Sequence, residues 1–143
     1  MMSKLTQQEK DFLLKEAKEV RERAYVPYSH FKVGAALLAE DGTLHLGCNV
    51  ENGTLSPTNC AERTALYRAI ADGHAPRSFK AIAVTGNTDE PITPCGTCRQ
   101  VLMELCGPHM PVIMTNSKGE VAESTVGALL PGAFVLPEDE EAR

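Results

Sequence analysis

Hydrophobic positions recur at helical spacing in the first part of the chain. Leu13 and Val20 fall on one face of a helix, and Thr6 with Glu9 forms the pattern of a capping box at its start. Pro27 follows this segment and cannot continue a helix, because its nitrogen carries no hydrogen. The pattern predicts an amphipathic helix that begins after Thr6 and is ended by Pro27, with a loop at 25–30.

Shorter apolar segments follow, separated by residues that favour turns. An Asp-Gly pair between the first two segments is typical of a β-hairpin. Four apolar segments are predicted as strands, at 31–39, 43–50, 79–85 and 112–115, and residues 120–123 are expected to add a short edge strand. Two segments with start and stop signals are predicted as helices: 60–70, with Asn59 as the N-cap, and 95–105, between Pro94 and Gly107.

The order of these elements predicts an α/β fold. Strand–helix–strand units at this spacing favour crossover connections and a sheet covered by helices. A chain of 143 residues has the length of one domain, and the sequence contains neither a linker nor an internal repeat. We therefore expect residues 1–143 to form a single domain, with an acidic segment at 137–141 that frays.

Charge and composition narrow the classes of function. Nineteen acidic residues against 14 Lys and Arg give a net charge of −5, which argues against a surface that binds nucleic acid. No apolar segment has the length of a membrane span, and the N-terminal residues lack the apolar region of a secretory signal. We expect a cytoplasmic protein whose five cysteines are metal ligands, catalytic thiols or core residues.

Three cysteines stand at the starts of two predicted helices. Cys95 and Cys98 form a C-x-x-C turn, and Cys60 begins the preceding helix. Free N–H groups and the dipole at a helix N-terminus favour thiolate over thiol. Three thiolates suit zinc and leave its fourth position open, which is typical of catalytic zinc. Glu62 stands two residues after Cys60, where a carboxylate can exchange protons with water at that position.

Two other interpretations compete with this one. A zinc-stabilised binding module would need a fourth ligand, from Cys48, Cys106 or one of four scattered histidines, and none of these has the spacing of a zinc finger. A redox role for the C-x-x-C turn would leave Cys60 and Glu62 as coincidences.

The cysteine and glutamate motifs resemble the signature of the zinc-dependent nucleoside deaminases. Five further matches, which run as far as Phe134, resemble the small homotetrameric cytidine deaminases: 28–37, 47–52, 60–65, 94–102 and 129–134. The resemblance implies a three-layer sandwich, with a central mixed five-stranded sheet flanked by helices. It also implies a homotetramer with shared active sites.

The resemblance implies a role for each residue of the zinc motif. Cys60, Cys95 and Cys98 would hold Zn²⁺, and Glu62 would carry protons between zinc-activated water, N3 of cytosine and the departing amine. Cytidine and 2′-deoxycytidine would yield uridine, 2′-deoxyuridine and ammonia, as in pyrimidine salvage. Arg63 would hydrogen-bond to a ligand sulfur and offset the negative charge of three thiolates.

Six more residues match positions that bind the nucleoside in this family. They are Phe31 against the base, Asn49 and Glu51 on the ribose hydroxyl, the backbone of Ala61 and Thr93 at the pyrimidine edge, and Phe134 from another subunit. A carboxylate at Glu51 accepts from a 3′-hydroxyl and repels a 3′-phosphate, which favours nucleosides over polynucleotides.

Leu55 stands where this family usually has a tyrosine, in a loop offered to a neighbouring subunit. We expect the smaller side chain to loosen the pocket and to allow N4-substituted or otherwise modified cytidines. Two alternatives remain: a deaminase of another aminopyrimidine nucleoside or nucleoside antibiotic, and a polynucleotide-editing deaminase, which the acidic charge disfavours. The sequence leaves Arg99, Cys48 and Cys106 without a role.

Overall fold

The computed structural model of the protein describes residues 4–137. The acidic segment that we expect to fray therefore lies, apart from Pro137, outside the described residues. The elements are, in chain order, α1 (Gln7–Arg21), β1 (Val33–Ala39), β2 (Leu44–Cys48), α2 (Ala61–Ala71), β3 (Phe79–Gly86), α3 (Gly96–Cys106), β4 (Pro111–Asn116), β5 (Val121–Thr125) and α4 (Val126–Leu129).

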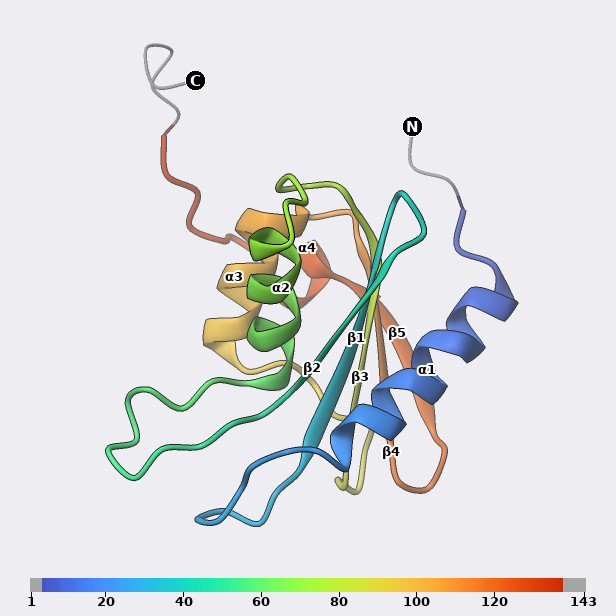
Figure 1. The fold of residues 1–143 in the computed structure, drawn as a ribbon. Coiled ribbons are helices and arrows are strands. Elements are labelled where there is room, and N and C mark those ends of the chain that lie inside the picture. Colours follow the sequence, from blue (N-terminus) through green and yellow to red (C-terminus); the bar gives the residue numbers. More distant parts are fainter. Residues whose placement is uncertain (1–3, 138–143) are drawn as a thin grey trace.

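One five-stranded sheet forms the middle layer of the molecule. Its strand order is β2-β1-β3-β4-β5, in which β3 and β4 run parallel and the other neighbours run antiparallel. Helix α1 covers one face, whereas α2 and α3 cover the other (Figure 1). This arrangement confirms the expected three-layer sandwich with a mixed central sheet.

The central strands are buried on both faces because helices cover both. All seven residues of β1 are buried, so the strand reads as a continuous apolar segment instead of an alternating one. Alternate residues enter different cores: Leu37 packs toward α2 and α3, and Ala36 packs toward α1 with Leu13 and Ala17.

The capping box predicted for α1 is confirmed. The Thr6 hydroxyl accepts the Glu9 N–H at 3.1 Å, and the Glu9 carboxylate accepts the Thr6 N–H at 2.9 Å. That carboxylate also binds Lys80 of β3 at 2.8 Å, and this hydrogen bond lowers the pKa of Glu9. The cap therefore fixes both the start of α1 and its position on the sheet.

This helix ends a few residues earlier than the predicted loop at 25–30. The helix ends at Arg21, well before Pro27, and Glu22 is its C-cap. The reason is tertiary, because the N–H of Tyr25 is taken by the carbonyl of Asn49 at 3.0 Å, next to a β-bridge between Tyr25 and Val50. Pairing with another segment thus stops the helix before proline could.

The predicted N-cap of α2 is wrong. Cys60 is the N-cap, and Asn59 pairs its backbone with Val50 while its side chain donates to the Thr64 hydroxyl at 3.1 Å. The Cys60 sulfur makes no capping hydrogen bond, which leaves it available to another partner.

The strand expected at 120–123 lies at Val121–Thr125, and α4 was not predicted because four residues give no periodic pattern.

A glycine without a side chain lets α2 lie directly on β2. A Cβ atom at Gly47 would stand 2.4 Å from the carbonyl oxygen of Ala61 and 2.5 Å from the nitrogen of Ala65. Both neighbours are backbone atoms of α2, so they cannot move aside independently. The position of the first turn of α2 therefore depends on this contact.

We predict that Gly47→Ala destabilises the fold by about 2–3 kcal/mol, because the added methyl group forces α2 away from β2. Gly96→Ala is the matched control, since nothing lies within 4 Å of a Cβ at Gly96 and alanine favours a helix. Urea denaturation of both variants measures the difference. Equal midpoints for the two variants would contradict the proposed contact.

Candidate metal centre and active site

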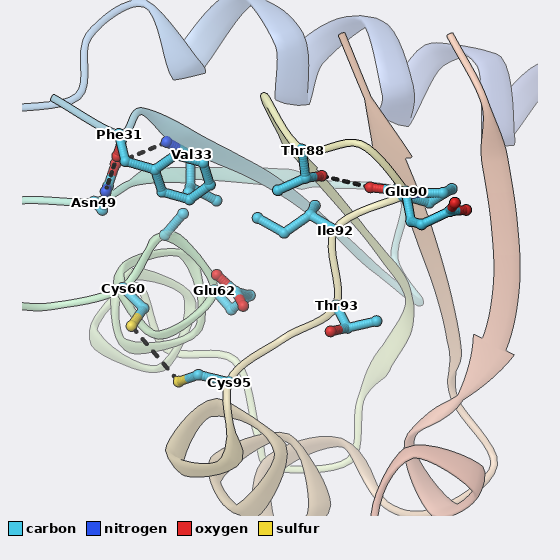
Figure 2. A pocket seen from close by; sticks show the side chains of 12 residues that line it. Phe31, Val33, Asn49, Cys60, Glu62, Thr88, Glu90, Ile92, Thr93 and Cys95 are labelled. Carbon is cyan, nitrogen blue, oxygen red and sulfur yellow. Dashed lines mark hydrogen bonds between the residues drawn. The ribbon is translucent and has the colours of Figure 1, made fainter. Parts of the chain in front are cut away.

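The starts of α2 and α3 meet at one point. Cys60 is the N-cap of α2 and Cys95 the N-cap of α3, and their sulfur atoms face each other at 3.8 Å (Figure 2). The sulfur of Cys98 completes a group whose members all lie within 4.8 Å of one another. Two sulfurs bound to tetrahedral zinc at about 2.3 Å stand about 3.8 Å apart, so the spacing fits that ion.

The surroundings stabilise negative sulfur. The guanidinium of Arg63 donates to the Cys60 sulfur at 3.1 Å, and the Cys98 N–H donates to the Cys95 sulfur at 3.5 Å. A hydrogen bond from Cys98, together with Arg63, lowers the pKa of Cys60 to about 5, whereas the same hydrogen bond and burial raise the pKa of Cys98. Thiolate is the form that binds a metal ion, so Cys60 is prepared for binding, whereas Cys98 releases its proton when an ion binds.

Glu62 occupies the second position of α2 and points into the cavity beside the sulfurs (Figure 2). Its side chain is almost completely buried, with 4% of the residue exposed. Burial raises the pKa of Glu62 to about 7. A carboxyl group with this pKa can both take and give a proton near neutral pH, which is what a general acid–base residue does.

A cavity of about 510 Å³ opens in front of these residues. Four of the predicted substrate-binding residues line it together with Cys60, Glu62 and Cys95: Phe31, Asn49, Ala61 and Thr93. These residues are far apart in the chain, and the fold brings them together from four separate segments. The volume lies within the range of small-molecule sites.

Asn49 forms part of the cavity wall and also fixes it. Its side-chain oxygen accepts the Val33 N–H at 2.9 Å, and its nitrogen donates to the Phe31 carbonyl at 2.7 Å. Both bonds hold the segment that carries the Phe31 ring at the cavity (Figure 2). Each polar atom of the amide retains one further hydrogen-bonding position.

Glu51 and Phe134 lie outside this cavity. The Glu51 carboxylate accepts the N–H groups of Tyr28 and Ser29 at 3.1 Å each and also binds the Ser29 hydroxyl. These hydrogen bonds, that of the Ser29 hydroxyl above all, lower the pKa of Glu51. Phe134 is 65% exposed on the C-terminal tail, where the Gln100 side chain holds its carbonyl at 2.9 Å.

Sequence reasoning missed one wall of the cavity. Thr88, Glu90 and Ile92 line it, although the sequence indicates only a loop there. The Thr88 hydroxyl donates to the Glu90 carbonyl, and the Ile92 N–H bonds to the Thr115 carbonyl at 3.3 Å, so the loop is fixed. An isolated isoleucine between two prolines was the one available signal.

Arg99, which the sequence left without a role, supports the loop before Cys95. Its Nε donates to the Pro94 carbonyl at 2.7 Å, and one Nη donates to the Leu129 carbonyl at 2.7 Å. The side chain thus ties the metal-site loop to the end of α4. Cys48 and Cys106 do not belong to the sulfur group, and burial raises the pKa of Cys106 to about 12.

We predict that Cys95→Ser lowers the zinc retained after dialysis by at least about tenfold, since a hydroxyl is a far weaker zinc ligand than a thiolate. Cys48→Ser is the matched control and retains about one zinc ion per chain. Atomic absorption on the dialysed proteins gives the metal content. The same loss of zinc in both variants would argue against the three-sulfur site.

None of the helices in residues 4–137 has the length and apolar character needed to cross a membrane.

Residues 7–114 match the family model described as the cytidine and deoxycytidylate deaminase zinc-binding region. The chain is 61% identical to a cytidine deaminase of Sporosarcina psychrophila, over 85% of this chain and 88% of that protein. It is 52% identical to one of Halalkalibacterium halodurans, over 88% and 94% of the two chains.

Solved structures agree with the sequence matches. A crystal structure of cytidine deaminase from Burkholderia pseudomallei superposes with a TM-score of 0.86 at 54% identity, covering 87% of this chain and 98% of that one. The cytidine deaminase of Mycobacterium tuberculosis gives 0.75 at 36% identity, over 88% and 97%. The chain therefore belongs to the cytidine and deoxycytidylate deaminase family, whose cofactor is zinc, and its three cysteines are positioned to bind a metal ion.

Proposed function

We propose that this chain, a zinc-dependent cytidine deaminase, hydrolyses cytidine and 2′-deoxycytidine to uridine, 2′-deoxyuridine and ammonia. The observation that carries the proposal is the position of Glu62, a buried carboxyl group beside three facing sulfurs in a cavity large enough for a nucleoside. A site that only stabilised the fold would need no such group next to its metal ligands.

Glu62 is proposed to move the protons of the reaction. Zinc bound to the three cysteines supplies the Lewis acidity that makes water a nucleophile near neutral pH. The Glu62 carboxylate accepts the proton that water releases as its oxygen attacks C4, and then donates it to N3 of the ring. As the bond between C4 and the amino nitrogen breaks, the proton of the new C4 hydroxyl passes through the same carboxyl group to the departing amino group, so that one water molecule is consumed and ammonia is released.

The cavity also offers groups that would orient the base. The N–H of Ala61 lies in the first turn of α2, where backbone N–H groups have no partner within the helix. It is proposed to donate to the carbonyl oxygen of the pyrimidine, while the Thr93 carbonyl accepts from its amino group. The Phe31 ring, on the opposite side of the cavity from Cys95, would pack on the base (Figure 2).

The charge of the cavity favours a nucleoside without phosphate. Glu62 and Glu90 line the cavity, whereas no Lys, Arg or His among the described residues does so. A phosphate group would meet carboxylates there without a compensating cation. Asn49 is proposed to bind the ribose hydroxyl, and Glu51 to add an acceptor while it holds the Tyr28–Ser29 turn.

A homotetramer with shared sites is part of the proposal. The loop that carries Leu55 projects from the body of the chain, and Leu55 itself is 72% exposed (Figure 1). Phe134, Val135 and Leu136 are likewise exposed apolar residues of the C-terminal tail. Because none of these side chains reaches its own cavity, they are proposed to complete the site of a neighbouring copy.

The domain organisation, the compartment and the pathway of the enzyme are also part of the proposal. We propose that residues 1–143 act as a single domain, that the enzyme works in the cytoplasm, and that it serves pyrimidine salvage. Neither nucleic acid nor membrane is proposed as a partner of the catalytic site. A related activity on another aminopyrimidine nucleoside or nucleoside antibiotic is kept as an alternative, because Leu55 replaces a larger ring.

We predict that Glu62→Gln lowers kcat for cytidine by about 10³-fold or more and leaves the zinc content unchanged, because the amide cannot carry protons. Glu104→Gln, an exposed change on α3, is the matched control and keeps full activity. Loss of cytidine absorbance measures the rate. Turnover that survives in the Glu62 variant would exclude this carboxyl group as the proton carrier.

We further predict that Leu55→Tyr lowers the rate on N4-methylcytidine relative to cytidine by about tenfold, since the added ring fills the space for the methyl group. Competition between the two nucleosides gives the ratio of kcat/KM directly. An unchanged ratio would show that Leu55 does not set tolerance at N4. An equal loss on both substrates would indicate damage to the subunit contact instead.

A further inference from the structure

A second cavity, of about 540 Å³, lies on the α1 side of the sheet and shares no lining residue with the catalytic cavity. Lys15, Lys18 and Arg21 of α1 line one side, and Lys118 lines the other from the turn between β4 and β5. Figure 1 shows α1 on the opposite face of the sheet from α2 and α3. We call this cavity the α1 groove.

The α1 groove is cationic in a chain whose net charge is −5. Four basic side chains line it, and no Asp or Glu among the described residues does so. Lys15 and Lys18 are exposed and form no ion pair with another described residue. Lys118 lies 3.9 Å from Asp89, with both side chains largely in solvent, so that pair neutralises little of its charge.

Arg21 contributes less to the charge available for a ligand. Its Nε donates to the Lys32 carbonyl at 2.9 Å, and one Nη lies 3.7 Å from the Glu22 carboxylate. The dipole of α1 explains why cations occur in its last turns. It does not explain Lys118, which faces them from a different element.

The floor of the groove carries hydroxyl groups at a favourable place in the fold. Thr85 and Thr115 stand side by side at the carboxyl ends of the parallel strands β3 and β4, a position where α/β folds commonly bind ligands. Thr85 is 4% exposed, and its hydroxyl makes no hydrogen bond to another described residue. Among the described residues Arg63 Nε is the one fully buried side-chain nitrogen or oxygen without a partner, so the Thr85 hydroxyl is open to the groove and can donate to a ligand there.

We propose that the α1 groove binds a phosphorylated nucleoside. Lysines on both rims would bind the phosphates, the Thr85 hydroxyl would donate to one of them, and Leu14 and Val121 would give the base an apolar surface. The volume matches the catalytic cavity, which is large enough for a nucleoside but presents carboxylates to a phosphate. The catalytic cavity would thus take uncharged nucleosides, and the α1 groove would take phosphorylated ones.

Isothermal titration with UTP tests the proposal on the zinc-loaded full chain. Saturating uridine keeps the catalytic cavity filled, so that any heat from UTP reports another site. We expect saturable UTP binding that weakens as salt rises, because exposed lysines are screened. Absence of UTP binding under these conditions would overturn the proposal.

Two double variants and one single variant locate the binding. We expect Lys15→Gln with Lys18→Gln to weaken UTP binding by about tenfold, and Thr85→Val to weaken it as well. Lys4→Gln with Arg23→Gln removes the same charge outside the groove and is expected to leave binding unchanged. If both double variants weakened UTP binding equally, the effect would come from the net charge of the protein and would contradict a specific site in the groove.

Further probes distinguish the sources of phosphate. UTP is expected to bind more tightly than inorganic tripolyphosphate, which lacks a base, and more tightly than single-stranded dT20. Equal or tighter binding of either probe would overturn the assignment to a nucleotide. A change in sedimentation coefficient in the Lys15 and Lys18 double variant would assign the groove to a contact between copies and would also overturn it.

Discussion

The convergence of two helix N-termini on one point is the constraint on which the rest of the structure depends. Helix α2 reaches that point because Gly47 lets it lie directly on β2, and α3 reaches it because Arg99 holds the loop before Cys95. The N-cap residue of each helix is a cysteine. The meeting of the two helix N-termini therefore also brings the three cysteine sulfurs together.

The electrostatics of the site follow from this convergence. Three thiolates exceed the charge of Zn²⁺ by one, which would make bound water less acidic. Free N–H groups at the two helix starts and the guanidinium of Arg63 offset part of that charge. Burial raises the pKa of Glu62, because a buried carboxylate loses its hydration. The raised pKa suits a group that first accepts and then donates a proton.

Local motifs were predictable from sequence, and contacts between distant segments were not. Cys60, Glu62, Cys95 and Cys98 could be assigned to one centre because helix-start signals accompany them. Asn59 was misassigned as the N-cap because its pairing with Val50 leaves no local trace. The wall around Ile92 and the hydrogen bonds of Glu51 likewise depend on segments far away in the chain.

X-ray absorption at the zinc edge tests the central claim most directly, because it counts the ligands of the metal. For the zinc-loaded chain the account predicts three sulfur neighbours at about 2.3 Å and one lighter neighbour from solvent. That lighter neighbour should be displaced when a ligand fills the catalytic cavity. Four sulfurs, or the scattering pattern of a histidine ring, would mean a closed site and would contradict the account.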